Sequence, residues 1–203
     1  MRITAKLFLA IALVTGAMSA YAAPLAVDFT TPTLNFTDGT WSLGWEFNVL
    51  TAYTVTALGA YDDGMNGLTQ SHDVGIFDPS GTLLTWTTVN PGDSLTSWWR
   101  FHSITPYTLL PGNDYRIAET TGSENYTWDP IGFTEDPAIV LVQSRETYST
   151  TLVYPTSLDV QLGIFGPNMQ GSTGTSTPEP SSMLLLGSGL IGAVAYGRRR
   201  LGL

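Results

Sequence analysis

The sequence predicts an all-β protein: an antiparallel β-sandwich, jelly-roll-like or immunoglobulin-like, flanked by an N-terminal signal helix and a C-terminal transmembrane helix. Apolar and polar residues alternate over Trp41–Val49, which is the period of a strand. Glycine- and proline-rich turn signals recur through the middle of the chain, and an apolar segment with basic flanking residues lies near each end. The predicted segments are 1–22 (signal peptide), 23–168 (β-sandwich domain), 169–177 (flexible linker) and 178–203 (C-terminal segment).

The first 22 residues have the three parts of a secretory signal peptide. Arg2 and Lys6 give a positive start, and an apolar run follows at 7–14. Ala20 and Ala22 place small residues at the third and first positions before the expected cut. The apolar run is too short to cross a hydrocarbon core of about 30 Å. We therefore expect export, with cleavage by signal peptidase after Ala22.

Short apolar runs between turn signals predict about eight strands in the middle domain. Residues 41–49 give the clearest alternation, and 55–61 repeat it. The other predicted strands lie at 74–76, 84–86, 99–101, 115–118, 139–142 and 160–164. Turns are predicted at 78–81, 90–93 and 111–114. No amphipathic helical stretch occurs outside the two ends, so an antiparallel sandwich is the expected architecture.

The middle of the chain is strongly acidic. Between residues 23 and 177 it carries three basic residues, Arg100, Arg116 and Arg145, against sixteen acidic ones, a net charge of −13 without any lysine. Such a field repels phosphate backbones and anionic lipid surfaces, so nucleic-acid binding is excluded. Most of the charge is interpreted as solvated surface. The chain has no cysteine, so the fold depends on burial and hydrogen bonding rather than disulfides.

An acidic, glycine-rich segment offers a candidate calcium site. Asp62, Asp63 and Asn66 lie on it, and Asp73 follows shortly after. Calcium takes about six to eight oxygen ligands and needs a backbone that folds around the ion. The spacing departs from that of an EF-hand loop. The alternative is a solvated hairpin loop in which Asn66 and Gly67 make the turn, and no other cofactor is expected.

Catalysis is not expected of this chain. His72 and His102 are the only histidines, and the sequence has no Gly-x-Ser-x-Gly nucleophile elbow. A closed structural zinc site is not expected without cysteine. Glu46, on the polar side of its predicted strand, is the carboxylate that a glycoside hydrolase would use. A cell-surface polysaccharide hydrolase is therefore the alternative function.

Aromatic residues are abundant and suggest carbohydrate binding. Six tryptophans and nine tyrosines can supply both a core and flat platforms for sugar stacking. Trp98 and Trp99 point to opposite faces if they share a strand, which makes Trp98 a candidate ligand-binding residue. The alternative is that Trp98 covers the edge of the other sheet. We expect a structural or carbohydrate-binding protein, with exopolysaccharide as the candidate partner.

The C-terminal region contains a linker, a short motif, an apolar span and a basic end. Residues 169–177 are rich in Gly, Ser and Thr, the composition of a flexible tether. The motif Pro178-Glu179-Pro180 comes next, and 181–197 are apolar, enough for a transmembrane helix of about 25 Å. The cluster Arg198-Arg199-Arg200 then acts as a membrane stop. Because basic flanks stay cytoplasmic, the acidic domain is expected on the far face of the membrane.

This order of motif, span and arginine cluster resembles the PEP-CTERM sorting domain over 178–203. The resemblance implies that an exosortase, a membrane-embedded cysteine protease, recognises Pro178-Glu179-Pro180 and cleaves nearby. Two prolines hold an extended backbone that suits a protease cleft. Family members are commonly associated with exopolysaccharide and biofilm matrix. The implied location is the inner membrane, through the C-terminal helix, before processing, and the cell surface or the medium afterwards.

The middle domain carries a second resemblance. The runs at 44–47, 55–64 and 71–77 are similar to an uncharacterised β-sandwich domain that often precedes PEP-CTERM tails. The similarity extends from Trp41 to Thr120. Because that family has no established activity, the resemblance implies the fold and the neighbouring tail rather than a chemistry.

Overall fold

The structure is a computed structural model that describes residues 23–37, 39–161 and 163–174. The predicted signal peptide, sorting motif, transmembrane span and arginine cluster lie outside these ranges. Within them, the one helix is the short 3-10 turn η1 (Asp63–Met65). No helix of the described part is long and apolar enough to cross a membrane. The described domain is all-β, as predicted.

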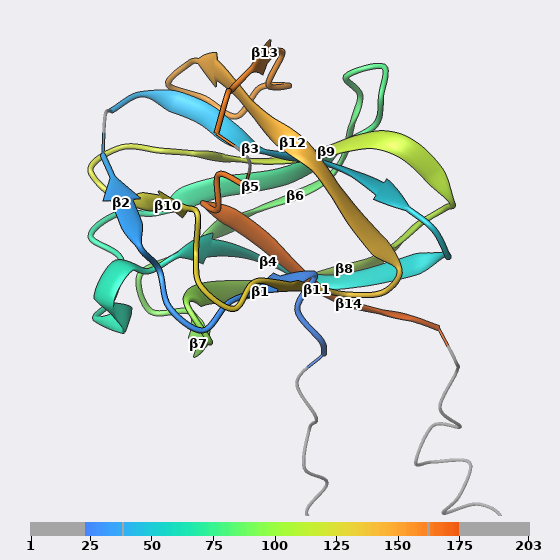
Figure 1. The fold of residues 1–203 in the computed structure, drawn as a ribbon, viewed down its shortest axis with the longest axis horizontal. Helices are drawn as coiled ribbons and strands as arrows, with labels where there is room; N and C mark the ends of the chain where they lie inside the picture. Colours follow the sequence, from blue (N-terminus) through green and yellow to red (C-terminus); the bar gives the residue numbers. More distant parts are fainter. Residues whose placement is uncertain (1–22, 38, 162, 175–203) are drawn as a thin grey trace, which may run out of the picture.

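Two antiparallel sheets form the body of the domain (Figure 1). The larger has the strand order β13-β12-β3-β9-β5-β6 and the smaller β14-β4-β8-β7. The larger sheet comprises β3 (Trp41–Val49), β5 (His72–Phe77), β6 (Leu83–Val89), β9 (Gly112–Thr120), β12 (Ile139–Tyr148) and β13 (Ser157–Leu158). The smaller comprises β4 (Tyr53–Tyr61), β7 (Ser94–Thr96), β8 (Trp99–Leu109) and β14 (Pro167–Thr173).

Two further ribbons, each of two short antiparallel strands, accompany these sheets. Strand β1 (Val27–Asp28) pairs with β11 (Thr134–Glu135), and β2 (Leu34–Phe36) pairs with β10 (Tyr126–Trp128). The β2–β10 ribbon packs near the start of β3, where Leu43, Tyr126 and Ile164 form a small second core. This ribbon lies at one side of the domain (Figure 1).

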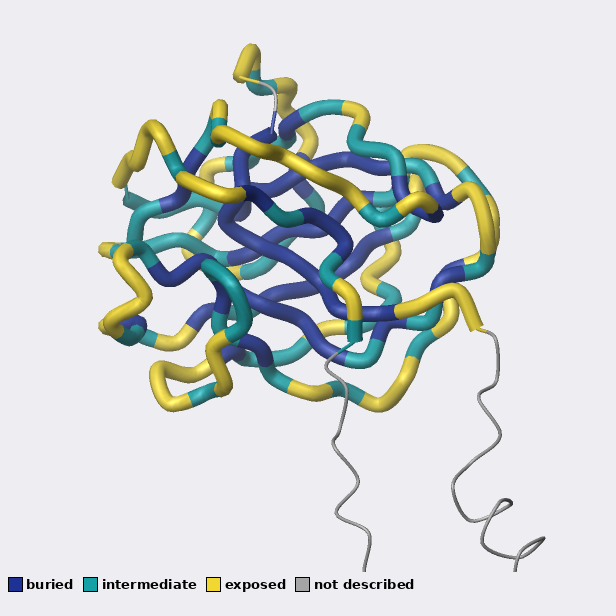
Figure 2. Tube along the Cα trace, turned by 60° about the horizontal axis from the view of Figure 1, so that its bottom comes forward, coloured by how far each residue is buried: buried dark blue, intermediate teal, exposed yellow. Residues whose placement is uncertain are grey.

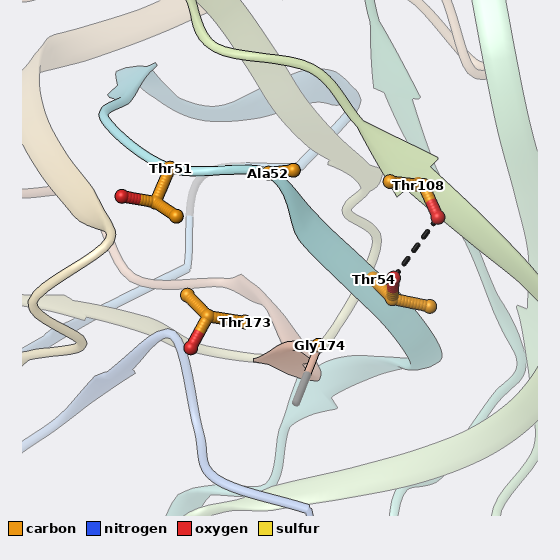
Figure 3. A pocket seen from close by; sticks show the side chains of 6 residues that line it. All are labelled: Thr51, Ala52, Thr54, Thr108, Thr173 and Gly174. Carbon is orange, nitrogen blue, oxygen red and sulfur yellow. Dashed lines mark hydrogen bonds between the residues drawn. The ribbon is translucent and has the colours of Figure 1, made fainter. Parts of the chain in front are cut away.

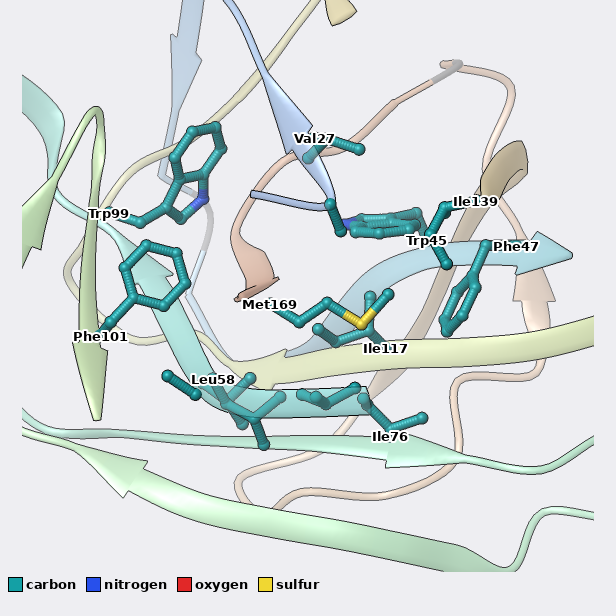
Figure 4. Packing of buried hydrophobic residues seen from close by; sticks show 14 of the residues in the cluster. Val27, Trp45, Phe47, Leu58, Ile76, Trp99, Phe101, Ile117, Ile139 and Met169 are labelled. Atoms are coloured by element: carbon teal, nitrogen blue, oxygen red, sulfur yellow. The ribbon is translucent and has the colours of Figure 1, made fainter. Parts of the chain in front are cut away.

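The two sheets share one hydrophobic core, which makes the domain a β-sandwich. Figure 4 shows Trp45, Phe47 and Ile117 of the larger sheet in the same cluster as Leu58 and Met169 of the smaller. Figure 2 shows buried chain through the centre and exposed chain in the connecting loops. Burial of these side chains supplies the main driving force for folding.

Two buried tryptophans also tie the core to the start of β14. The indole N–H of Trp45 donates to the Pro167 carbonyl at 2.9 Å, and that of Trp99 donates to the Gly166 carbonyl at 3.1 Å. A buried indole needs such an acceptor. The core therefore fixes the backbone that leads into the last strand.

Strand β3 is buried on both faces, although its alternation predicts only one buried face. The segment 149–158 covers the polar face. Ser42 Oγ donates to the Val153 carbonyl at 2.6 Å and lies 3.2 Å from the Val153 amide nitrogen, whose N–H it accepts. The alternation identifies the core-facing side, but it cannot show a distant segment that folds over the other side.

Strand β14 includes residues that were predicted to belong to the linker, so the linker begins later than predicted. Residues 169–173, expected in the linker, pair with β4 as far as the Thr173–Tyr53 pair. A Cβ atom on Gly171 would lie 2.4 Å from the Tyr53 ring and 2.5 Å from the Thr54 carbonyl oxygen. Glycine is thus required at this position because close packing leaves no room for a Cβ atom, and its presence does not indicate flexibility. The folded domain extends to Thr173, beyond the predicted end at 168.

Two local predictions, one of a strand and one of a hairpin turn, are wrong. The described residues of the predicted strand at 160–164 form an irregular loop, in which Val160 is 92% exposed. The predicted hairpin turn at Asn66 and Gly67 is part of a crossover, since β4 belongs to the smaller sheet and β5 to the larger. Local turn chemistry alone does not say which sheet the next strand joins.

Candidate functional site

A pocket of about 340 Å³ opens where the β2–β10 ribbon meets the larger sheet. This volume lies within the range of small-molecule binding sites. We call it the aromatic pocket. Its lining residues are Phe36, Trp41, Tyr126, Trp128, Glu146, Asp159, Gln161 and Ile164. None of them was predicted as a site residue, because they come from segments far apart in the sequence.

The ribbon places three aromatic rings on one side of the aromatic pocket. Tyr126 lies opposite Phe36 in the strand register. The ring centroid of Phe36 is 6.0 Å from that of Tyr126 and 5.5 Å from that of Trp128, and both pairs are tilted by 59°. Phe36 is 45% exposed and Trp128 is half-buried. These two rings are therefore open to a ligand.

The larger sheet supplies the opposite wall. Glu146 lies opposite Leu43, and Tyr148 lies opposite Trp41, so these four side chains share one face of the sheet. Tyr148 packs edge-on against Trp41 with centroids 5.5 Å apart. Tyr148 is exposed and Trp41 is half-buried. A second aromatic pair thus stands beside the pocket.

Packing and backbone hydrogen bonds hold the floor of the aromatic pocket in place. Ile164 packs with Leu43 and Tyr126 in the second core. The next residue, Phe165, donates its N–H to the Thr127 carbonyl at 2.8 Å and accepts the Thr127 N–H at 3.3 Å. This backbone pairing joins the segment after the 159–161 loop to strand β10. The aromatic wall and the floor are therefore built as one unit.

Polar groups line the rest of the aromatic pocket. Glu146 comes from β12, and Asp159 and Gln161 come from the loop after β13. The Asp159 N–H donates to the Ser144 carbonyl at 3.3 Å, and Asp159 Oδ1 accepts the Gln161 N–H at 2.7 Å. Carboxylate and amide groups beside aromatic rings suit a ligand that has both polar and apolar faces.

Trp98, the predicted ligand-binding residue, lies away from the aromatic pocket. It occupies the turn between β7 and β8 rather than a strand. Its indole N–H donates to the Phe29 carbonyl at 3.1 Å, and its ring stacks on Phe29 with centroids 6.0 Å apart. These contacts pack Trp98 against the main core. Trp86 on β6 is the more exposed tryptophan, at 55%.

Asp62, the first residue of the predicted calcium set, anchors the crossover loop. Its Oδ2 accepts Arg100 Nε–H at 2.7 Å, and its carboxylate accepts the N–H groups of Asn66 and Gly67 at 3.0 to 3.2 Å. The residue is only 1% exposed. A guanidinium and two amides thus occupy the oxygens that calcium would need.

The other carboxylates of this set have separate partners. Asp63 accepts the side-chain amides of Asn35 and Asn125 at 2.8 and 2.6 Å, and Asp73 accepts the Thr88 hydroxyl at 2.7 Å. Within the described ranges, no three His, Cys, Asp or Glu side chains are grouped as a metal site requires. Calcium binding therefore stays a prediction, without support from the arrangement of these residues.

Glu46, the predicted hydrolase carboxylate, is the centre of a buried ion cluster. Its Oε2 lies 2.8 Å from Arg116 and 2.9 Å from Arg145, and its Oε1 accepts Gln143 Nε2–H at 3.1 Å. Burial opposes ionisation, but together the guanidiniums of Arg145 and Arg116 outweigh it and lower the pKa of Glu46. An enclosed, ionised carboxylate is poorly placed to exchange protons with a substrate.

The same arginines fasten the segment 149–158 over the larger sheet. Arg116 donates to the Pro155 carbonyl at 2.5 Å, and its guanidinium carbon lies 4.3 Å from the centre of the Tyr154 ring. Arg145 donates to the Thr156 carbonyl at 3.4 Å. The cluster therefore has a structural explanation that does not need a substrate.

Neighbouring groups hold both histidines. His72 is buried, and its Nδ1 lies 2.7 Å from the Thr120 carbonyl oxygen. Because a carbonyl only accepts, Nδ1 carries the hydrogen. Burial lowers the pKa of His72. His102 Nδ1 lies 3.0 Å from Asp93 Oδ2, and neither ring lines the aromatic pocket.

Glu119 on β9 is a buried carboxyl group that the sequence does not single out. It is 3% exposed, and its Oε2 has no hydrogen-bond partner in the described part of the chain. Burial, and to a smaller extent the nearby Glu124, raises the pKa of Glu119 well above its ordinary value of 4.5. The group therefore takes up a proton in the folded state more readily than in the unfolded chain.

A second pocket, of about 440 Å³, lies beside the end of β14 (Figure 3). It is lined by Thr51, Ala52, Thr54, Thr108, Thr173 and Gly174. The hydroxyls of Thr54 and Thr108 bond to each other at 2.9 Å. Its lining has no charged or aromatic side chain, so it offers a ligand less than the aromatic pocket does.

Comparison with known families identifies two parts of the chain. The model of a domain of unknown function (DUF4082) matches residues 30–165. The chain belongs to the DUF4082 family. A model of the PEP-CTERM protein-sorting motif matches residues 176–200. The curated proteins and the solved structures compared contain no match.

The DUF4082 match includes every residue that lines the aromatic pocket. It confirms the predicted kind of domain and extends it beyond 41–120. The sorting-motif match spans Pro178-Glu179-Pro180 and the Arg198-Arg199-Arg200 cluster, which confirms the predicted PEP-CTERM sorting motif. That motif implies an exported protein that an exosortase processes.

Proposed function

We propose that this DUF4082 protein is a non-catalytic, carbohydrate-binding component of the extracellular matrix or biofilm. The observation that carries the proposal is the aromatic pocket. Sugar rings present an apolar C–H face that stacks on aromatic side chains and hydroxyl groups that bond to carboxylates and amides. Phe36 and Trp128 provide the rings, and Glu146, Asp159 and Gln161 provide the polar groups.

The position of the aromatic pocket also supports this function. In Figure 1, β2 and β10 lie at the left of the domain and β13 lies at its top, whereas the two ends of the described chain leave from its lower side. A domain tethered through its C-terminal end therefore keeps the pocket open to a ligand. Exopolysaccharide is the ligand expected at the cell surface.

The sorting tail supports a delivery route. In this proposal signal peptidase removes 1–22, a helix near 181–197 anchors the chain in the inner membrane, and the arginine cluster stays cytoplasmic. Exosortase cleavage near Pro178-Glu179-Pro180 then yields the surface or extracellular form. The match at 176–200 supports the last step.

Within the sandwich class, the path of the chain favours the jelly-roll-like alternative. The chain changes sheet between β3 and β4, β4 and β5, β6 and β7, β8 and β9, and β13 and β14. An immunoglobulin-like sandwich keeps more of its successive strands in one sheet. Jelly rolls are also common among sugar-binding domains of the lectin type.

The polysaccharide hydrolase remains the second candidate, for one reason. Glu146 and Asp159 line the same pocket, and pairs of carboxylates perform glycoside hydrolysis. This pair replaces Glu46, which is enclosed by two arginines. Release of reducing sugar by the wild-type protein, lost in Glu146→Gln, would favour the enzyme; its absence favours the binding protein.

Retention of the purified full-length protein on exopolysaccharide from the producing cells tests the binding function. We expect retention of the wild type and at least about tenfold weaker retention of Trp128→Ala, because stacking supplies much of the binding energy. Trp86→Ala is the control, since Trp86 is exposed and lies outside the pocket. Absence of retention, or equal loss in both variants, would contradict the proposal and favour a structural role without a ligand.

A further inference from the structure

The charge of the aromatic pocket restricts the glycans that it can take. We propose that the pocket binds an amino-sugar glycan, a polysaccharide segment whose rings carry protonated amines. The inference rests on the proposed carbohydrate-binding function and names its ligand class. Two of the lining side chains, Glu146 and Asp159, are carboxylates, and none is basic. Such a lining favours a cationic ligand over an anionic one.

The basic residues of the described domain are committed elsewhere. Arg100 pairs with Asp62 at 2.7 Å, and Arg116 and Arg145 both pair with Glu46, at 2.8 and 2.9 Å. These are the only Lys or Arg residues between 23 and 177. A uronate or sulfated glycan would therefore meet two carboxylates without a compensating cation.

The rings of the aromatic pocket suit an ammonium group as well as a sugar face. A cation is attracted to the face of Trp, Tyr or Phe within about 6 Å of the ring centre. The Phe36 and Trp128 rings are tilted by 59° to each other, and the Trp41 and Tyr148 rings by 90°. Rings at different angles present more than one face to a bound group. An amino sugar offers both an apolar ring face and a cation to them.

A bare metal ion fits this lining less well. Calcium requires about six to eight oxygen ligands, whereas Phe36, Trp41, Trp128 and Ile164 contribute only apolar or aromatic surface. The same carboxylates that would be too few for a metal are sufficient to pair with amines. The combination of rings and carboxylates is therefore more specific for an organic cation.

Calorimetric titration of the full-length protein tests the inference with three probes of equal length. These are a glucosamine oligosaccharide, its N-acetylated counterpart and a uronate oligosaccharide. Acetylation removes the charge and keeps the sugar ring. We expect the glucosamine probe to bind at least about tenfold tighter than the acetylated probe, no detectable binding of the uronate, and a preference that weakens with added salt.

Variants separate the carboxylates from the rings. Glu146→Gln with Asp159→Asn is expected to remove the preference for amines, while Trp128→Ala weakens both glycans. Asp114→Asn, an exposed carboxylate outside the pocket, is expected to change neither. If a thermal melt shows that the double variant is unfolded, Asp159→Asn alone is expected to reduce the preference.

Three results would overturn the inference. Equal or tighter binding of the acetylated or uronate probe would leave the carbohydrate-binding function intact and refute the ligand class. Glucosamine binding that survives Trp128→Ala would show general attraction to the acidic domain instead of binding in the pocket. Failure of all three probes, together with no retention on exopolysaccharide, would refute the proposed function itself.

Discussion

Glu119 and Glu46 are both buried carboxyl groups, and their surroundings shift the two pKa values in opposite directions. Glu119 has an oxygen without a partner in the described residues and lies in a core that raises its pKa. Glu46 has two arginines that lower its pKa against the effect of burial. The same kind of side chain thus weakens the fold at neutral pH in one place and supports it in another.

Glu119→Gln is expected to stabilise the protein at neutral pH. Below the ordinary pKa of 4.5, which the unfolded chain keeps, the carboxyl is protonated in both states and its stabilising contribution is fully present. As the pH rises, the unfolded chain releases this proton first, so stability is lost progressively up to the raised folded pKa. Glutamine cannot ionise. Thermal melts should show a higher midpoint for the variant at neutral pH and no difference near pH 4; a lower midpoint at neutral pH would refute this explanation.

Glu46→Gln is expected to have the opposite effect. The substitution leaves Arg116 and Arg145 without their carboxylate, and breaking a buried ion pair costs about 3 kcal/mol or more. Urea unfolding at neutral pH measures this loss. Asp114→Asn, at an exposed position, is the control for removing one negative charge. A change of less than about 0.5 kcal/mol for Glu46→Gln would contradict a structural role.

The structural roles of Glu46 and Trp98 depend on contacts with segments that are distant in the sequence, which local patterns do not reveal. The alternation over 41–49 places Glu46 on the polar face of its strand, as observed, but the arginines that enclose it are 70 and 99 positions away. The adjacent Trp99 makes Trp98 a candidate ligand-binding residue in the sequence, yet the contacts of Trp98 with Phe29 decide its position. Pairing between distant segments is not encoded in a local pattern.

At the scale of elements, long strands with strong patterns were predictable and short ones were not. Strand β3 has the predicted bounds, and strands were expected within β4, β5, β6, β8, β9 and β12. The two ribbons were missed, because strands of two or three residues carry no measurable period. The aromatic pocket depends on one of these ribbons. The aromatic residues that line it can be identified in the sequence, but the sequence does not show that the fold brings their rings together.

Strand β14 gives a prediction at this scale. Gly171→Ala is expected to lower the free energy of unfolding by about 1–3 kcal/mol, because the new Cβ would overlap the Tyr53 ring and the Thr54 carbonyl. Gly174→Ala is the matched control, since no atom lies within 4 Å of its Cβ position. Urea unfolding compares the two. Equal effects would mean that β14 ends before Gly171, as the linker prediction assumed.

At the scale of the whole molecule, the strongly acidic charge raises the question of calcium binding, and a thermal melt tests that binding directly. An ion that binds only the folded protein raises its melting temperature. Because Asp62, Asp63 and Asp73 have separate partners, we expect that a chelator leaves the melting temperature of the wild type unchanged within error. A drop of several degrees on chelation, restored by calcium, would revive the calcium hypothesis and require these loops to rearrange.

The division of the whole chain into segments could be predicted from the sequence, because the signals at its two ends are short, contiguous stretches of characteristic composition. The acidic domain, the Pro178-Glu179-Pro180 motif and the arginine cluster follow one another in the sequence, and the motif match at 176–200 agrees with that order. The boundary at 168 was misplaced because a small-residue strand has the composition of a linker. Export and processing are the claims on which the proposed surface function depends.

Intact-mass spectrometry of the protein recovered from the cell surface or the medium tests this claim most directly. The expected species begins at Ala23 and ends after the linker but before Met183, with the apolar span and the arginines removed. A full-length chain of 203 residues recovered from the cytosol would contradict it.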